Sequence, residues 1–99
     1  MEDTTIETNE AIQILVLESG QKLISKIEEV VADIGEPNCK LDDPYVILYD
    51  KITNSISLQQ WLIEVADQQT FLICSDKILT VIEHPKPTIL KKYKSLIKK

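Results

Sequence analysis

The apolar residues of this chain form short runs after a polar beginning. Residues 1–10 are acidic and show no apolar periodicity, so we expect a flexible N-terminal segment there. The run at residues 12–17 is rich in β-branched side chains, with Ile12, Ile14 and Val16 on one face, and Gly20 marks a turn after it. This pattern predicts a first β-strand.

Residues 21–34 fit two different elements. Their apolar side chains recur at helical spacing, and Gly35 with Pro37 is typical of a helix C-terminus. The alternative is a long bent strand that pairs back on the first, because Leu23 and Ile27 also fit an alternating pattern and the β-branched content suits a sheet. Periodicity alone favours the helix.

Strand patterns dominate the middle of the chain, and a helical pattern ends it. Pro85 and Pro87 cannot donate ladder hydrogen bonds, so the sheet should end before them, and Pro87 suits the first turn of a helix. The predicted strands lie at residues 45–49, 56–63, 71–74 and 78–82, and the predicted helix at 88–98. The expected organisation is a β domain at residues 11–83 and a basic C-terminal helix within 84–99.

The charge is divided unevenly along the 99 residues. Residues 1–83 hold all 16 acidic residues and five lysines, which gives −11, whereas residues 84–99 hold six lysines and no acid. The acidic part should repel nucleic acid at long range, so any RNA contact must be local or use the C-terminal lysines. Those lysines have three open interpretations: they bind RNA phosphates, contact an acidic neighbouring subunit, or increase solubility.

The sequence offers little catalytic chemistry. No nucleophile with a base, carboxylate pair in an apolar setting or phosphate-binding glycine loop is recognisable, so we expect no enzyme activity and no cofactor. Cys39 and Cys74 form no metal-ligand motif and are expected to pack as small hydrophobic residues. The sequence has no stretch of about 18 apolar residues and no basic-then-apolar leader, which favours a cytoplasmic protein without a membrane segment.

Several motifs resemble the Sm, Sm-like (LSm) and Hfq family of RNA-binding proteins. Residues 75–81 fall where the family's second conserved block ends, and the chain is also similar to a divergent Sm-like group of marine phages. The motifs are Ile12-x-Ile14-x-Val16-x-x-x-Gly20-x-x-Leu23-x-Ser25-x-Ile27-x-x-Val30 and Asn38-x-x-Leu41-x-Asp43. The resemblance implies a strongly bent, five-stranded antiparallel sheet, a small open barrel, in which residues 21–33 form a strand. It further implies that edge strands pair between subunits and close a ring.

The resemblance also implies functional residues. Asn38 matches the asparagine of the family's nucleotide pocket, Asp33 lies one residue upstream of the family's aspartate, and Cys74-Ser75 replaces its Arg-Gly pair. The candidate RNA-binding residues are Asp33, Asn38, Lys40, Lys91 and Lys92, and the candidate subunit-interface residues are Trp61, Ile73, Ile78 and Val81. No catalytic or metal-binding residue is expected.

The expected function is therefore a homo-oligomeric ring of about five to seven subunits, with a pentamer or hexamer preferred. Such a ring would bind single-stranded RNA with little sequence preference, in RNA regulation or processing, because lysine lacks the planar fork that arginine uses to read bases. The alternative is a phage structural or assembly module that binds protein and not RNA. The acidic body and the absence of arginine favour this alternative.

Overall fold

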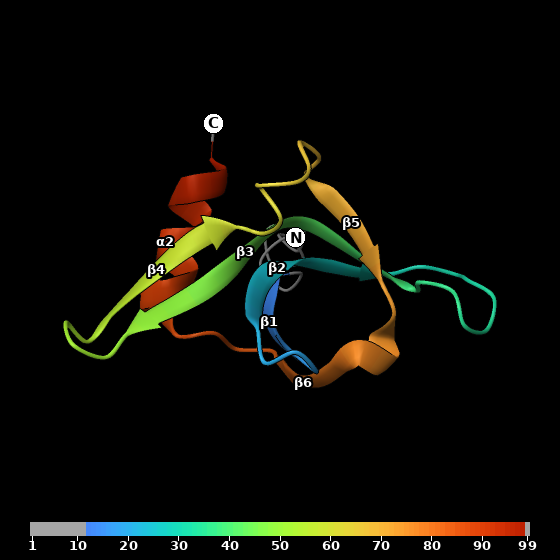
Figure 1. Cartoon of the computed structure of the whole chain (residues 1–99), viewed down its shortest axis with the longest axis horizontal. Helices are drawn as coiled ribbons and strands as arrows, with labels where there is room; N and C mark the ends of the chain where they lie inside the picture. The colour runs from blue at the N-terminus through green and yellow to red at the C-terminus, as the bar shows by residue number, and fades with distance from the viewer. Residues whose placement is uncertain (1–11, 99) are drawn as a thin grey trace, which may run out of the picture.

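The computed structural model describes residues 12–98, and within them the chain is a mainly antiparallel β structure with one C-terminal helix (Figure 1). This confirms the predicted fold class. The flexible segment expected at residues 1–10 lies outside the described residues. The strands are β1 (Ile12–Leu17), β2 (Lys22–Glu29), β3 (Cys39–Asp50), β4 (Ser55–Gln60), β5 (Thr70–Ile73) and β6 (Ile78–Ile82), with a 3-10 turn η1 (Ser75–Lys77) and helix α2 (Pro87–Ile97).

The long strand β3 organises the sheet. The strand order is β4-β3-β2-β1-β6, and β5 also pairs with β3. Residues 39–42 of β3 pair with β5, whereas residues 45–50 pair with β4, so the outer edge of β3 changes partner in mid-strand. Figure 1 shows β4 and β5 diverging from β3 in different directions. The change of partner bends the antiparallel sheet as expected, although the sheet has six strands where the resemblance implied five.

A β-bulge at Asp43 and Pro44 produces this bend. The register between β2 and β3 shifts here, and Asp43 has a φ of 54°, in the left-handed region. The Asp43 N–H donates to the Gln69 carbonyl at 2.7 Å, and the fully buried Ser25 hydroxyl lies 3.0 Å from the Asp42 carbonyl oxygen. Pro44 has no N–H to leave unpaired at this irregular position. The bulge therefore satisfies its polar groups locally.

The helix that periodicity favours for residues 21–34 is wrong. The strand that the resemblance implies for residues 21–33 is confirmed at Lys22–Glu29, and residues 30–33 lie outside it. Leu23 and Ile24 are both fully buried because they point to opposite faces of β2, into two separate core clusters. An amphipathic helix would have buried Val31 and Ile34 on the same stripe, but both side chains are fully exposed beyond the strand. Because β2 buries apolar residues on both faces, its sequence does not alternate and its apolar spacing matches that of a helix.

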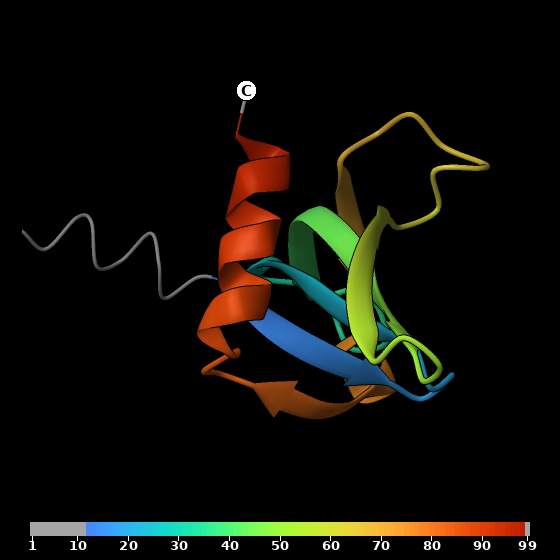
Figure 2. The same cartoon turned by 90° about the vertical axis from the view of Figure 1, so that its left-hand side faces the viewer.

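Helix α2 covers one of the two core clusters. Tyr93 is fully buried against Ile12, Ile14, Ile24 and Tyr45. The Tyr93 and Tyr45 rings meet edge to face, with centroids 5.8 Å apart. Figure 2 shows the helix standing beside the beginning of β1. The second cluster lies on the other face of the bent sheet, around Leu15, Leu17, Leu23 and Leu41.

Three strands present outer edges that are unpaired within residues 12–98. β6 pairs with β1 alone, whereas β4 and β5 each pair with β3 alone. Within the described residues, no helix has the length and apolarity needed to cross a membrane.

Candidate functional site

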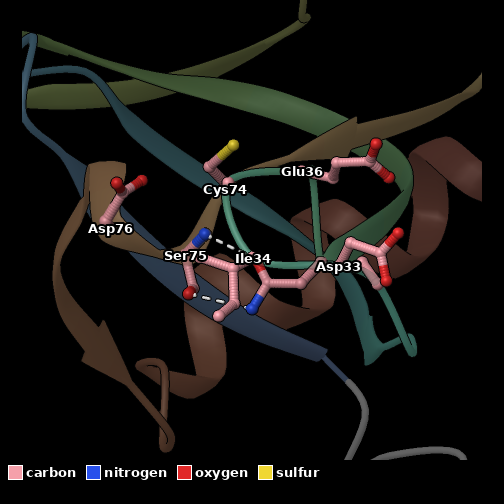
Figure 3. A pocket seen from close by; sticks show the side chains of 9 residues that line it. Asp33, Ile34, Glu36, Cys74, Ser75 and Asp76 are labelled. Carbon is pink, nitrogen blue, oxygen red and sulfur yellow. Dashed lines mark hydrogen bonds between the residues drawn. The ribbon is translucent and has the colours of Figure 1, made fainter.

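A pocket of about 340 Å³ lies between the β2–β3 loop and the start of η1 (Figure 3). It brings together Asp33 and Asn38, which the sequence predicted as neighbours in one site, and adds the segment that replaces the family's Arg-Gly pair. We call it the loop pocket. Its polar lining comprises Asp33, Glu36, Asn38, Ser75 and Asp76, with Cys74 beside them.

The Asn38 side chain is engaged within the chain. Its Oδ1 accepts a hydrogen bond from the Ser75 N–H at 2.8 Å, and its Nδ2 donates to the Ser75 hydroxyl at 3.0 Å. The Asn38 main chain adds a bond from its N–H to the Ile73 carbonyl at 3.1 Å. Asn38 therefore connects β3 to the turn after β5 and orders the loop pocket, a role that the resemblance did not imply.

The loop pocket is acidic. Asp33, Glu36 and Asp76 contribute three carboxylates, and none of its described lining residues is cationic. Lys40 does not line the pocket, and its ammonium lies 3.8 Å from a carboxylate oxygen of Glu28, its cross-strand partner on β2. Carboxylates without a cation repel a phosphodiester backbone, so this pocket is poorly suited to RNA.

The remaining candidate RNA-binding residues lie far from the loop pocket. Lys91 and Lys92 are exposed on α2, and Figure 1 shows α2 in the left half of the molecule and the β2–β3 loop at its right end. Within residues 12–98, no carboxylate pairs with either lysine. The predicted RNA site thus divides into an acidic pocket, an ion-paired Lys40 and a basic helix surface.

The predicted interface residues lie on or beside the outer strands. Trp61 follows β4, is half-buried against Phe71 and donates from Nε1 to the Gln21 side-chain oxygen at 3.3 Å. Ile73 and Ile78 are half-buried and pack on the second core cluster, whereas Val81 is 45% exposed. These positions fit packing within the subunit, and a role in subunit contacts stays a prediction.

Three exposed apolar residues of β5 and β6 were missed by the sequence reasoning. Leu72 on β5 is 56% exposed, and on β6 Leu79 is 65% and Ile82 38% exposed. All three belong to runs in which apolar residues occupy both faces of a strand, and that absence of alternation was the available signal. Together with Val81 they leave apolar side chains at the unpaired edges of β5 and β6.

The two cysteines differ in environment. Cys39 is buried at the start of β3, and burial raises the pKa of its thiol, with smaller contributions from the charge of Glu29 and from Cys74. Cys74 is half-buried and lines the loop pocket. A buried thiol with a raised pKa is unreactive at neutral pH, so Cys39 fits the expected packing role. Among the described residues, no group of three or more His, Cys, Asp and Glu side chains is arranged to hold a metal ion.

Comparison with known proteins identifies a family without assigning an activity. None of the curated proteins matches the chain. A family described as a family of unknown function, DUF6561, matches residues 10–98, which include the whole sheet and α2. The chain therefore belongs to the DUF6561 family.

Proposed function

We propose that this chain assembles into a Sm-like homo-oligomeric ring that binds single-stranded RNA through the lysines of α2. The observation that carries the proposal is that β5 and β6, two of the three strands whose outer edges are unpaired within residues 12–98, carry exposed apolar side chains. Proteins generally protect such edges with charges, prolines or a covering element, and pairing between subunits in a ring would cover the β5 and β6 edges.

The edges are suited to pairing with each other. Leu72 flanks the β5 edge, and Leu79 and Val81 flank the β6 edge. Pairing of β6 with β5 of the next copy would extend the sheet from subunit to subunit and bury these side chains. A domain of this size buries a limited share of its own surface, so the added contact area would stabilise it.

Ring closure would also concentrate positive charge. Cyclic symmetry places every α2 on the same face of the ring, so Lys91 and Lys92 repeat around that face. The six lysines of residues 84–99 then form a cationic surface on an otherwise acidic particle. Lysine neutralises phosphate as a point charge, which predicts salt-dependent binding with little base preference.

The assembly is tested by light scattering coupled to size exclusion. We expect a mass of about five to seven chains for the unmodified protein and a monomer for Leu79→Glu combined with Val81→Glu, because a β6 edge carrying carboxylates cannot be buried. Ile52→Glu, at a 95% exposed position in the β3–β4 hairpin, is the matched control and should leave the mass unchanged. A monomeric unmodified protein at high concentration would refute the ring.

The RNA surface is tested by fluorescence anisotropy with short oligouridine and oligoadenine. Lys91→Ala combined with Lys92→Ala should weaken both complexes. It should also reduce the slope of log affinity against log salt concentration by about two for each subunit that contacts the RNA. Lys22→Ala combined with Lys51→Ala removes the same charge from exposed positions on β2 and in the β3–β4 turn, and should have a smaller effect. If both double substitutions weaken RNA binding equally, α2 is not the RNA-binding surface.

A ring that binds protein and not RNA is the second candidate. The acidic loop pocket favours it, because the resemblance places nucleotide recognition at Asn38 and this chain surrounds Asn38 with carboxylates. In that case the purified ring would carry no nucleic acid, seen in its ratio of absorbance at 260 and 280 nm, and would not bind either oligonucleotide at low salt. A protein that forms the ring but neither carries nucleic acid after purification nor binds the oligonucleotides would support this second candidate.

A further inference from the structure

The two ends of the sequence carry opposite charge. Residues 1–10 contain four carboxylates, those of Glu2, Asp3, Glu7 and Glu10, and no lysine. Residues 84–99 contain six lysines and no acid. The lysines Lys91 and Lys92 are exposed on α2 and have no carboxylate partner within residues 12–98.

The fold places the origin of the acidic segment beside this helix. Ile12, the first residue of β1, is 4% exposed and belongs to the same buried cluster as Tyr93 of α2. Ile89 and Leu90 of the helix pack against that cluster as well. Figure 2 shows β1 beginning next to α2, so the chain ahead of Ile12 is attached beside the helix that carries these lysines.

The length of the acidic segment is sufficient to reach along the helix. Ten residues span up to about 33 Å when extended, whereas the 11 residues of α2 extend for about 16 Å. A tether this short holds its charges near the helix at an effective concentration of about millimolar or higher. Contacts that are weak between exposed charges are therefore favoured within one chain.

We propose that the lysine-bearing face of α2 is a docking site for this chain's own residues 1–10. The four carboxylates occupy the lysines in the absence of another polyanion, and RNA displaces them. The segment thereby reduces the binding of short or sparsely charged anions, whereas a long phosphodiester chain, which contacts several helices at once, still binds. The competition rests on the proposed function, whereas the docking itself does not.

Docking is tested on the full chain by zero-length carbodiimide cross-linking and peptide mass spectrometry. We expect amide links from Glu7 or Glu10 to Lys91 or Lys92. The Glu18–Lys77 pair, 3.6 Å apart, is an internal positive control. Absence of the terminal link while the control link forms would overturn the proposal, whether or not the protein binds RNA.

Isotopic labelling identifies the chain that supplies the segment. After light and heavy chains are mixed by refolding, docking within one chain should give only light–light and heavy–heavy linked peptides. Mixed pairs would assign the acidic segment to the helix of a neighbouring subunit and overturn docking within the chain.

Competition is tested with oligouridine and a variant in which Glu2→Gln, Asp3→Asn, Glu7→Gln and Glu10→Gln are combined. We expect its affinity at low salt to rise by about fivefold to tenfold, since four exposed ion pairs are released. The matched control neutralises four exposed carboxylates outside the loop pocket, with Glu29→Gln, Asp50→Asn, Glu64→Gln and Asp67→Asn, and should change the affinity less. If the affinity for oligouridine rises equally in both variants, net charge explains the effect, and the proposal that residues 1–10 compete with RNA is overturned. If neither the unmodified protein nor these variants bind oligouridine, the proposed RNA function fails, and cross-linking still decides the docking.

Discussion

The Tyr93 hydroxyl donates a hydrogen bond of 2.9 Å to the carbonyl oxygen of Asp43. Tyr93 is the fully buried residue of α2, and Asp43 is the bulge residue at which β3 changes its outer partner from β5 to β4. The bond connects the C-terminal helix to the bend of the sheet. Helix position and sheet curvature are therefore coupled through one side chain.

We expect Tyr93→Phe to lower the free energy of unfolding by about 1–2 kcal/mol, because the ring remains packed while the partly buried Asp43 carbonyl loses its donor. Urea denaturation followed by circular dichroism measures the change. Tyr49→Phe is the control, since the exposed Tyr49 hydroxyl bonds to the exposed Asn54 side chain, and it should change stability by less than about 0.5 kcal/mol. Equal effects of both substitutions would contradict a special role for the Tyr93 bond.

The stability should also fall at high pH through Tyr93. Burial raises the pKa of Tyr93, and the charge of Asp43 raises it further, so the hydroxyl stays protonated in the folded chain after it ionises in the unfolded chain. This contribution is complete below about pH 10 and is lost as the pH rises above it, by about 1.4 kcal/mol per pH unit. Urea denaturation of the unmodified protein and of Tyr93→Phe from pH 8 to 11 isolates the contribution of Tyr93. Both proteins contain the same lysines, so the titration of those lysines affects both unfolding free energies alike. If the free energies of unfolding of the two proteins fall in parallel with pH, Tyr93 makes no such contribution.

Asn38→Ala should destabilise the loop pocket and leave RNA affinity unchanged. The substitution removes both hydrogen bonds to Ser75, so we expect faster amide exchange at Ser75 and a loss of about 1–2 kcal/mol in unfolding free energy. Asn38→Asp keeps the acceptor for the Ser75 N–H and should retain more of the protection. A large loss of RNA affinity in Asn38→Ala, with the ring intact, would return the nucleotide site to this pocket.

The cysteines should react with a thiol reagent in a fixed order. At pH 8 the half-buried Cys74 is expected to react first, whereas Cys39 should react only as the protein unfolds, because burial shields its thiol and raises its pKa. Reaction of Cys74→Ala and Cys39→Ala with a chromogenic disulfide measures each site alone. Rapid modification of Cys39 in native buffer would contradict its burial.

The sequence by itself determined the element types where one physical signal dominated. Alternation and β-branched side chains predicted the strands, and Pro87 followed by an apolar stripe predicted α2, which begins at that proline. The charge division between the body and the terminal lysines was equally visible, because it needs no contact between distant residues. Local propensity and composition were sufficient for these conclusions.

Only the tertiary structure decided the identity of β2 and the arrangement of the site. Leu23 and Ile24 are buried on opposite faces because α2 covers one side of the sheet and the bend encloses the other, and no local pattern distinguishes this from a helix. The structure likewise engaged Asn38 with Ser75, surrounded it with carboxylates and separated it from Lys91. Such relationships depend on which distant segments the bulge at Asp43 brings together, and a sequence pattern specifies neighbours along the chain and not across space.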